Sequence, residues 1–351
     1  MADVFVDPVI VTTPEDDATR EEIDFYLNNL AIWLKEALSS PYPWLHAIKA
    51  ANHLLECGRY PDSHLLRLWQ RRYGLNVNIY QLDRMINAFF RNPELDFETY
   101  LANAGYLIEP VPGSIVIHPD QFSVRLLDAV REDIHLLLAM ACGCRQMQSS
   151  VVDKLHIATL ALVGLKKEIA VTTLISASEP DFDWNVESMI SHIFPLLFTP
   201  DDLSPPLNII PLWDKGEDGI RYAIDRWYKQ DWQSQVPEPL AYRLGPHFIE
   251  SAHECGLDTN GDVLLKIVRI AATVIADQAK NIKAYKLHPL RESEAADSPQ
   301  RIRANDDARA WRLMIDKHGA GWRLHYWRIP APNGGIIEFS NVQKESGSKI
   351  Y

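Results

Sequence analysis

Apolar residues recur at helical spacing through much of the first 200 positions. They lie three or four positions apart from Ile23 to Leu34, from Leu45 to Leu55 and from Leu65 to Trp69, which is the period of an amphipathic helix. A longer series of the same kind runs from Phe122 to Gln146. The pattern predicts a mostly helical N-terminal body.

Other segments of this body carry weaker patterns. Residues 1–20 predict an extended arm, while 151–165 and 186–198 predict helices. The run 168–177 is rich in β-branched residues and predicts a strand. Residues 106–118 have apolar runs on both sides of a proline-glycine pair, which predicts a β-hairpin.

Helices followed by a hairpin is the element order of a winged helix, so residues 60–118 could bind DNA. The arginines that could face a duplex are Arg67, Arg71, Arg72, Arg84 and Arg91. The alternative is a structural helical subdomain whose arginines face solvent. No recognition-helix signature stands out, so we keep the structural interpretation.

The C-terminal end follows a different period. Apolar and polar residues alternate in 311–315, 322–326 and 336–341, as they do in β-strands, and glycine-containing segments that permit reversals separate the three runs. A helical pattern at 263–280 precedes them. This order predicts one helix followed by a three-stranded antiparallel meander.

The predicted fold class is therefore α+β and mostly helical. With 351 residues, the chain exceeds the usual size of a single core, so we expect two domains. The expected units are a helical body at 1–205, a proline-rich connecting region at 206–258, and a C-terminal domain at 259–351 made of a small helix plus antiparallel β-meander.

Charge is distributed unevenly along the chain. The net charge is −12, which argues against a protein that coats nucleic acid with its whole surface. Residues 280–351 hold 13 Lys and Arg against 8 Asp and Glu, a balance of +5, which leaves −17 for the first 279 residues. The acidic body could cover or regulate a basic tail domain. Separate solvation of the two surfaces explains the asymmetry as well.

The remaining composition excludes several classes of protein. Cys57, Cys142, Cys144 and Cys255 do not form a disulfide or zinc pattern, so we expect no metal and a reducing environment. No dinucleotide, P-loop or kinase motif indicates a cofactor. Because no signal peptide or long apolar run is present, the sequence predicts a cytoplasmic protein that does not contact a membrane.

Cationic residues are dense in the predicted meander. Arg312, Arg323, His325, Arg328 and Lys344 exceed what a small sheet needs for folding, which suggests an anionic ligand. The alternative is that long cationic side chains cover an exposed sheet face and shield its edges.

The order of short motifs here is similar to that of a known family. The motifs are His288-Pro-Leu-Arg291, Ala310-Trp-Arg-Leu, Gly321-Trp-Arg-Leu-His-Tyr-Trp327, Gly335-Ile-Ile-Glu-Phe339 and Gln343-Lys-Glu-Ser346. They resemble the RelE/HigB superfamily of toxin mRNA interferases, in which a helix leads through a basic turn into antiparallel strands. The resemblance covers 261–351. The chain departs from the family in its long N-terminal region and in Glu345, where a second lysine is usual.

The resemblance implies an RNA-cleaving domain that needs neither metal nor cofactor. Arg312, Arg323 and Lys344 would hold the phosphate, and His325 or Tyr326 would act as acid or base. Further residues would contact nucleic acid. These are His288, Arg291, Arg301, Arg303 and Arg328.

Two functions remain open at this point. The first is a toxin-like effector that cleaves or binds RNA, with RNA or the ribosome as partner, held in check by the acidic body and suited to defence against phage. The second is a non-enzymatic helical adaptor that binds a protein partner encoded by a neighbouring gene. Convergence of Arg312, Arg323, His325 and Lys344 in one concavity would favour the first.

Overall fold

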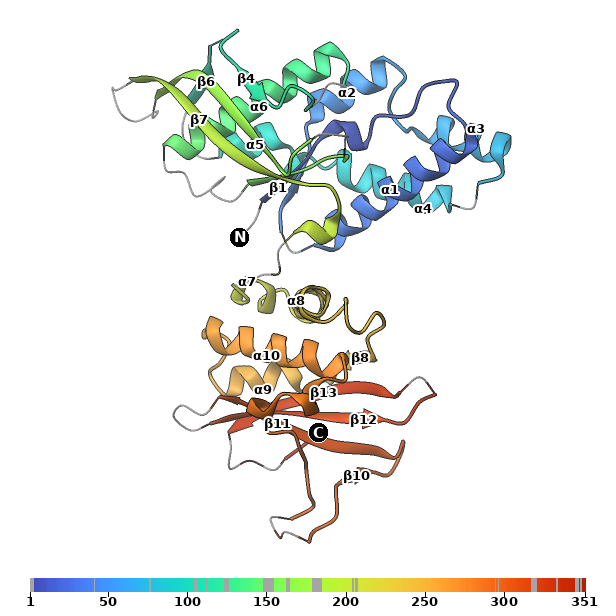
Figure 1. Ribbon diagram of the computed structural model, residues 1–351, viewed down its shortest axis with the longest axis vertical. Coiled ribbons are helices and arrows are strands. Elements are labelled where there is room, and N and C mark those ends of the chain that lie inside the picture. Colours follow the sequence, from blue (N-terminus) through green and yellow to red (C-terminus); the bar gives the residue numbers. More distant parts are fainter. Residues whose placement is uncertain are drawn as a thin grey trace. The chain divides into compact units, whose positions relative to one another are not determined.

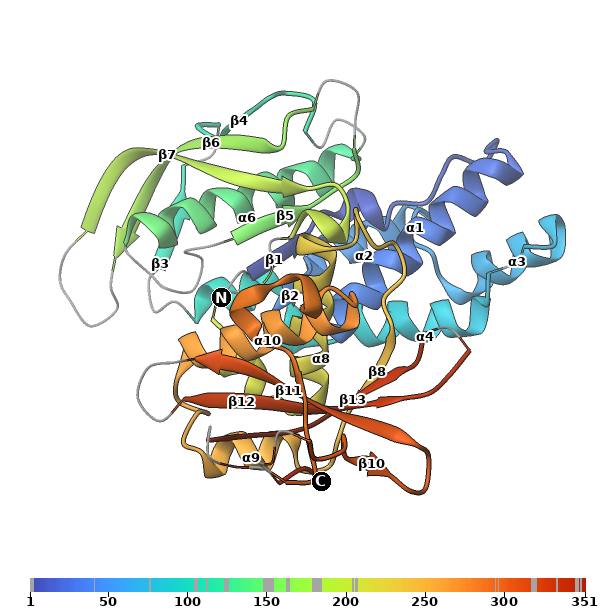
Figure 2. The same ribbon diagram turned by 60° about the horizontal axis from the view of Figure 1, so that its bottom comes forward.

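The chain forms two compact units, residues 1–203 and 204–351. Figure 1 and Figure 2 show the computed structural model of both units, and each is described by itself below. The structure describes residues 3–40, 42–75, 77–103, 107–111, 113–122, 126–147, 155–161, 165–178, 185–203, 205, 208–293, 295, 297–316, 321–332, 334–344, 347 and 349–351.

The first unit contains six α-helices and a seven-stranded sheet among its described residues. The helices are α1 (Arg20–Ser39), α2 (Ile48–Glu56), α3 (Ser63–Tyr73), α4 (Ile79–Phe90), α5 (Phe97–Ala102) and α6 (Asp128–Gln146). The strands are β1 (Asp3–Val6), β2 (Trp44–Leu45), β3 (Leu107–Pro110), β4 (Val116–His118), β5 (Leu155–Ala158), β6 (Glu168–Ser178) and β7 (Asn185–Leu197). Short 3-10 turns complete the unit at η1 (Pro8–Ile10), η2 (Pro93–Leu95) and η4 (Pro200–Asp202).

The sheet of the first unit has the order β2-β1-β5-β7-β6-β3, with β4 also beside β6. Strands β2, β1, β5 and β7 pair in parallel, whereas β6 and β7 form a long antiparallel ribbon. Strand β1 is buried along its whole length, and Phe5 stacks on Phe97 of α5. Central, buried strands of this kind are typical of parallel pairing.

The second unit is a six-stranded sheet with helices on one face. Its helices are α7 (Ile210–Trp213), α8 (Glu217–Asp231), α9 (Phe248–Glu254) and α10 (Gly261–Ile275), with 3-10 turns η5 (Ala279–Asn281) and η6 (Lys283–Tyr285). Its strands are β8 (Ala241–Leu244), β9 (His288–Pro289), β10 (Ile302–Arg303), β11 (Ala308–Asp316), β12 (Trp322–Ile329) and β13 (Ile336–Lys344). The order is β10-β11-β12-β13-β8, and β9 also pairs with β11.

Helix α10 occupies the centre of this unit. It lies between the sheet and α8, with α9 beside it on the same face of the sheet (Figure 1). Its buried residues face both neighbours: Val263, Leu264, Ile267, Val268, Ile270, Ala271, Ala272, Thr273, Val274 and Ile275. The sheet contributes Leu313, Leu324 and Phe339 to the same core. A helix that is apolar on most sides is expected in such a layer, and its charged residues Asp262, Lys266 and Arg269 are exposed.

The predicted fold class was wrong. The three alternating runs do lie in β11, β12 and β13, but they belong to a six-stranded sheet and not to a small meander. Strand β8 joins this sheet in parallel beside β13. The first unit carries a second, seven-stranded sheet, so the chain is not mostly helical.

Several elements of the first unit differ from prediction. Residues 186–198, expected as a helix, lie mainly in strand β7, and the expected extended arm contains strand β1. The predicted hairpin at 106–118 does not form, because β3 and β4 each pair with β6 and not with each other. This removes the wing from the proposed winged helix.

Residues 206–258 are also more than a connection. Their described part contains α7, α8, β8 and α9, and these elements contribute Trp213, Ile224 and Phe248 to the core of the second unit. The division between the compact units falls between Leu203 and Ser204.

The close approach of α7 to α8 predicts the effect of a methyl group at Gly219. A Cβ atom there would lie 2.1 Å from the Leu212 carbonyl oxygen. Gly219→Ala should therefore destabilise the protein by about 1–3 kcal/mol despite the better helix propensity of alanine. Gly261→Ala is the matched control, since its Cβ would meet only Ile210 at 3.6 Å. Urea unfolding compares the two, and equal stability of both variants would contradict this packing.

Candidate anion-binding groove

Strand β11 sends adjacent side chains to opposite sides of the sheet. Trp311 and Leu313 pack toward the helices, whereas Ala310 packs with Trp327 on the other face. Arg312 lies between them in sequence, opposite His288 on β9 and His325 on β12. The pairing of β9 with β11 covers only Trp311 and Arg312. Groups from both faces can therefore meet where β9 begins.

A small cavity of about 210 Å³ lies at this point. Its polar lining consists of Lys286, His288, Arg312 and Arg323, and Leu313 and Met314 complete it. A concave site lined by cationic side chains raises the local concentration of anions. Its size and donors suit a phosphate group, which arginine binds through paired N–H groups.

A larger cavity of about 540 Å³ adjoins the first, because Lys286 and His288 line both. Its apolar lining comprises Val274, Ala279, Ile282, Leu287, Trp311, Tyr326 and Ile337. Lys280, Lys283 and Arg328 add positive charge, and Asp277 adds one carboxylate. We call the two cavities together the basic groove.

The backbone places Lys286 in the groove. This residue ends η6 in the left-handed conformation, with φ 44°, which is uncommon for a residue other than glycine or asparagine. Asp277, another lining residue, also has a positive φ of 54°. Unfavourable backbone conformations of this kind often occur at functional sites.

The charges of the groove differ in how they are compensated. Arg328 is paired with Asp277, with Nη1 and Oδ1 2.9 Å apart, and it also donates to the Gly334 carbonyl oxygen. Within the described ranges, no carboxylate pairs with Lys280, Lys283 or Lys286. These lysines can therefore bind an anion without first breaking an ion pair.

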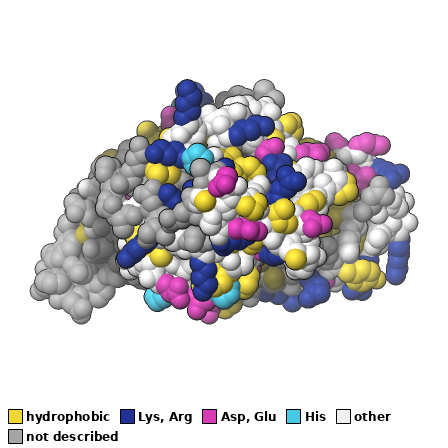
Figure 3. All heavy atoms as spheres, turned by 90° about the horizontal axis from the view of Figure 1, so that it is seen from below, with side chains coloured by type: hydrophobic (Ala, Val, Ile, Leu, Met, Phe, Trp, Pro, Cys, Tyr) yellow, Lys and Arg dark blue, Asp and Glu magenta, His cyan; other side chains and the backbone are white. Residues whose placement is uncertain are grey.

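The distribution of charge over one face of the molecule also bears on the kind of ligand. On the face seen in Figure 3, Lys and Arg are interspersed with acidic and apolar side chains. This distribution agrees with the net charge of −12 and favours a local anion site over a coating surface.

His325 lies outside the groove despite its place opposite Arg312. It is fully buried, and its Nδ1 is 3.1 Å from the carbonyl oxygen of Lys349, which is also within hydrogen-bond distance of Asn341 and Gln343. Burial lowers the pKa of His325 to about 4, and the nearby positive charges of Arg312, Arg323 and Arg301 add to this effect. A covered, neutral imidazole is poorly suited to exchange protons with a bound substrate.

The other predicted catalytic residues are dispersed. Tyr326 faces the helices, on the opposite side of the sheet from His325, and burial raises the pKa of its phenol. Lys344 is exposed at the end of β13 and lies close enough to Cys255 to lower that thiol's pKa slightly against the larger effect of burial. Arg312, Arg323 and His288 line one cavity, but His325 and Lys344 do not line it.

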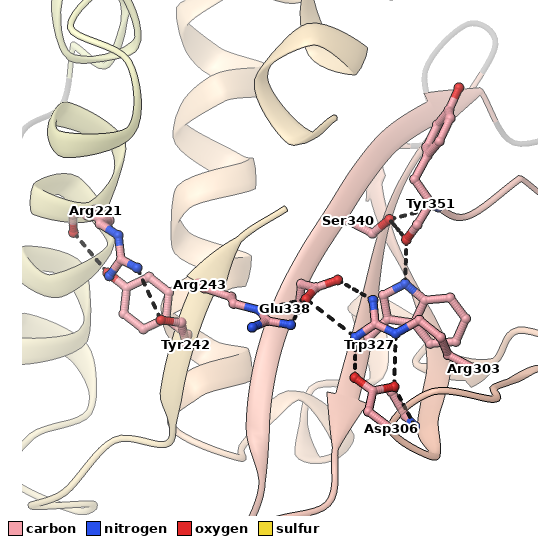
Figure 4. Close-up of polar contacts among 10 residues, drawn as sticks. Arg221, Tyr242, Arg243, Arg303, Asp306, Trp327, Glu338, Ser340 and Tyr351 are labelled. Atoms are coloured by element: carbon pink, nitrogen blue, oxygen red, sulfur yellow. Dashed lines mark hydrogen bonds and ion pairs between the residues drawn. The ribbon is translucent and has the colours of Figure 1, made fainter. Parts of the chain in front are cut away.

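Arg303, predicted to bind nucleic acid, belongs to a structural network (Figure 4). Its guanidinium pairs with Glu338 and with Asp306, where Nη2 and Oδ2 are 2.7 Å apart. Arg243 Nε donates to Glu338 Oε2 at 2.6 Å. Glu338 is buried, and these arginines lower its pKa against the opposing effect of burial. The network connects β8, β13 and the β10–β11 turn.

Two further predicted residues, Arg301 and Arg291, serve other roles. Arg301 is half-buried before β10, and its charge acts on His325. Arg291 donates from Nη1 to the Ser298 carbonyl oxygen at 2.8 Å and so holds its own loop. Neither residue lines the two cavities.

The lysines of the groove were missed by the sequence analysis. Lys280, Lys283 and Lys286 are spaced by three, a regular pattern that was available in the sequence. Residues at this spacing lie on one side of a 3-10 turn. Because these lysines follow an apolar helix and precede the predicted strands, their spacing could have indicated a basic surface next to the sheet.

A cavity of about 700 Å³ in the first unit has the opposite character. Its charged lining is mainly acidic, with Glu15, Asp17, Glu21 and Glu22. The guanidinium of Arg59 in the same lining pairs with Glu15. This cavity does not suit an anion, and we place the candidate site in the second unit.

Comparisons with known proteins assign no family. No family model, curated protein or solved structure matches the chain. Within the described residues, no helix is long and apolar enough to cross a membrane. In the same part of the chain, no three His, Cys, Asp or Glu side chains form a group that could hold a metal ion.

The network around Glu338 predicts a stability difference. Glu338→Gln should destabilise the protein by roughly 2–4 kcal/mol, because two guanidinium groups lose a buried carboxylate partner. Glu217→Gln, which removes an exposed ion pair with Arg221, should change stability by less than about 1 kcal/mol. Urea unfolding measures both, and a Glu338 variant as stable as the control would show that the network contributes little.

Burial of His325 predicts a pH dependence. Its pKa is about 4 in the folded chain and 6.5 when exposed, so between these values the unfolded chain binds a proton that the folded chain does not. The contribution of buried, neutral His325 to the free energy of unfolding is therefore complete above pH 6.5. It falls, by up to roughly 3 kcal/mol, as the pH decreases toward 4.

His325→Gln should remove this component, and His288→Gln, at an exposed position, should retain it. Urea unfolding at pH 7 and pH 5 gives the difference between each variant and the parent protein. An unchanged pH dependence in His325→Gln would disprove the assignment.

Proposed function

We propose that the second unit binds RNA through the basic groove, as a binding module and not primarily as a nuclease. The observation that carries this proposal is the convergence of Lys286, His288, Arg312 and Arg323 on one small cavity. The resemblance of residues 261–351 to RNA-cleaving toxins is consistent with an RNA ligand.

Electrostatics support a phosphate chain as the ligand. Lys286 and His288 link the two cavities, so a ligand with consecutive phosphates can contact both. Binding of phosphates by cations releases counterions and weakens with added salt, with a slope of about −0.7 per contact for single strands. A single phosphate would use only part of this groove.

The positions of the acid and base candidates favour binding over cleavage. His325 is covered by the segment that contains Lys349, and Lys344 lies outside both cavities. His288 is the imidazole that lines the groove in the described part of the chain, and it has no second imidazole beside it there. We retain the acidic first unit as a proposed regulator of this binding.

The adaptor function is the second candidate. Exposed apolar residues on the β6–β7 ribbon and β4, namely Met189, Ile193 and Val116, are a feature of protein-binding surfaces. The groove has more specific chemistry, and we therefore place RNA binding first.

Charge removal in the groove tests the proposal. Lys286→Gln and Arg323→Gln should each weaken the binding of a fluorescein-labelled single-stranded RNA and reduce the magnitude of its salt slope by about 0.7. The reason is the loss of one phosphate contact. Fluorescence anisotropy of the full chain at several KCl concentrations measures both quantities.

Arg309→Gln is the matched control, since Arg309 is exposed on β11, the strand that carries Arg312, but lines neither cavity. Its affinity and salt slope should equal those of the parent protein. Equal losses in all three variants would refute the groove as the binding site. RNA cleavage that stops in His288→Gln while binding persists would instead identify a nuclease.

A further inference from the structure

The larger cavity of the groove contains polar groups that no described residue satisfies. Tyr326 is only 4% exposed, lines this cavity, and its hydroxyl has no hydrogen-bond partner in the described ranges. The indole Nε1 of Trp311, in the same lining, is buried without a partner. The Tyr326 hydroxyl is therefore available to a ligand that accepts a hydrogen bond in this cavity, and Trp311 supplies an aromatic wall beside it.

The shape and lining of the cavity define the kind of ligand. Its volume of about 540 Å³ lies within the range of about 300–1,000 Å³ that is common for small-molecule pockets. Leu287, Ile282 and the ring of Trp311 give it apolar walls. A flat heterocycle with a hydrogen-bond acceptor on its edge fits an apolar site that contains an indole ring and a phenol.

The neighbouring cavity supplies the second part of the ligand. Its cationic lining suits a phosphate, and Lys286 and His288 stand between the two cavities. An apolar site next to a phosphate site, with shared cations between them, matches a nucleotide, whose base and phosphate are joined by a sugar.

We infer that the larger cavity binds an unpaired nucleobase of the RNA, with the adjacent phosphate held by Lys286, His288, Arg312 and Arg323. This inference rests on the proposed function and extends it, because it defines the substrate as single-stranded. A base inside a cavity cannot remain stacked and paired in a duplex. A free nucleotide shares the same chemistry and is distinguished in the test.

The test compares ligands that differ only in their bases. The full chain is titrated with fluorescein-labelled ten-nucleotide oligouridylate, with an abasic oligomer that keeps the same phosphates, and with duplex RNA of the same length. Oligouridylate should bind at least about 10-fold more tightly than the abasic oligomer or the duplex, as expected from base–aromatic stacking.

Two variants locate the base site. Trp311→Leu should weaken oligouridylate binding about 5- to 100-fold, and Tyr326→Phe, which removes only the hydroxyl, should weaken it about 2- to 10-fold. Neither should change binding of the abasic oligomer. Tyr285→Phe is the matched control, because Tyr285 packs nearby on η6 without lining the cavity.

The outcomes separate this inference from the proposed function. Equal binding of all three ligands, with the salt slope still dependent on Lys286, would overturn the base site and leave RNA binding intact. Loss of abasic binding in Tyr326→Phe would also overturn it. Absence of any charge-dependent binding would refute both. If uridine monophosphate displaces the labelled oligouridylate, the base site exists and a free nucleotide is a sufficient ligand. If only an unlabelled oligomer displaces it, the base site exists and its ligand is an RNA strand.

Discussion

Burial of α10 on two sides is the constraint on which the second unit depends. The helix fills the space between the sheet and α8, and it can do so because apolar residues cover most of its circumference, while Asp262, Lys266 and Arg269 form an exposed stripe. Small residues such as Ala271 and Ala272 allow close packing. The chain leaves this helix at Ile275 and turns through η5 and η6 directly into β9. The lysines of the groove therefore lie beside β11 because α10 ends there.

Because side chains alternate between the two faces of β11, neighbouring residues of this strand line two cavities of different chemistry. Trp311 enters the apolar cavity on the helix side, and the next residue, Arg312, enters the cationic cavity. Elsewhere on the face away from the helices, the Glu338 network and the hydrogen bonds to the carbonyl oxygens of Lys349 and Tyr351 satisfy buried polar groups. These contacts stabilise the sheet, whereas Lys280, Lys283 and Lys286 in the groove pair with no carboxylate in the described ranges.

Particular elements show why the fold was only partly predictable. In β7, Ile190, Phe194 and Leu197 lie four and three positions apart, as on one face of a helix. The same segment pairs with β6 from Pro195 to Asn185, which buries alternate residues. A short apolar run is compatible with both periods, and its distant partner decides between them. The same holds for β1, whose burial depends on β2 and β5.

The sequence by itself determined the helices α1, α6 and α10, the three strands at the C-terminal end, and the concentration of cations among them, because these follow from local periodicity and turn residues. The family resemblance named Arg312, Arg323 and His288 among the candidate residues, and these three line one cavity. Only the tertiary structure decided that β8 completes the sheet, that His325 is covered, that Arg303 pairs with Glu338, and that the lysines of η5 and η6 join the groove. These outcomes depend on contacts between residues far apart in the chain, which local patterns do not specify.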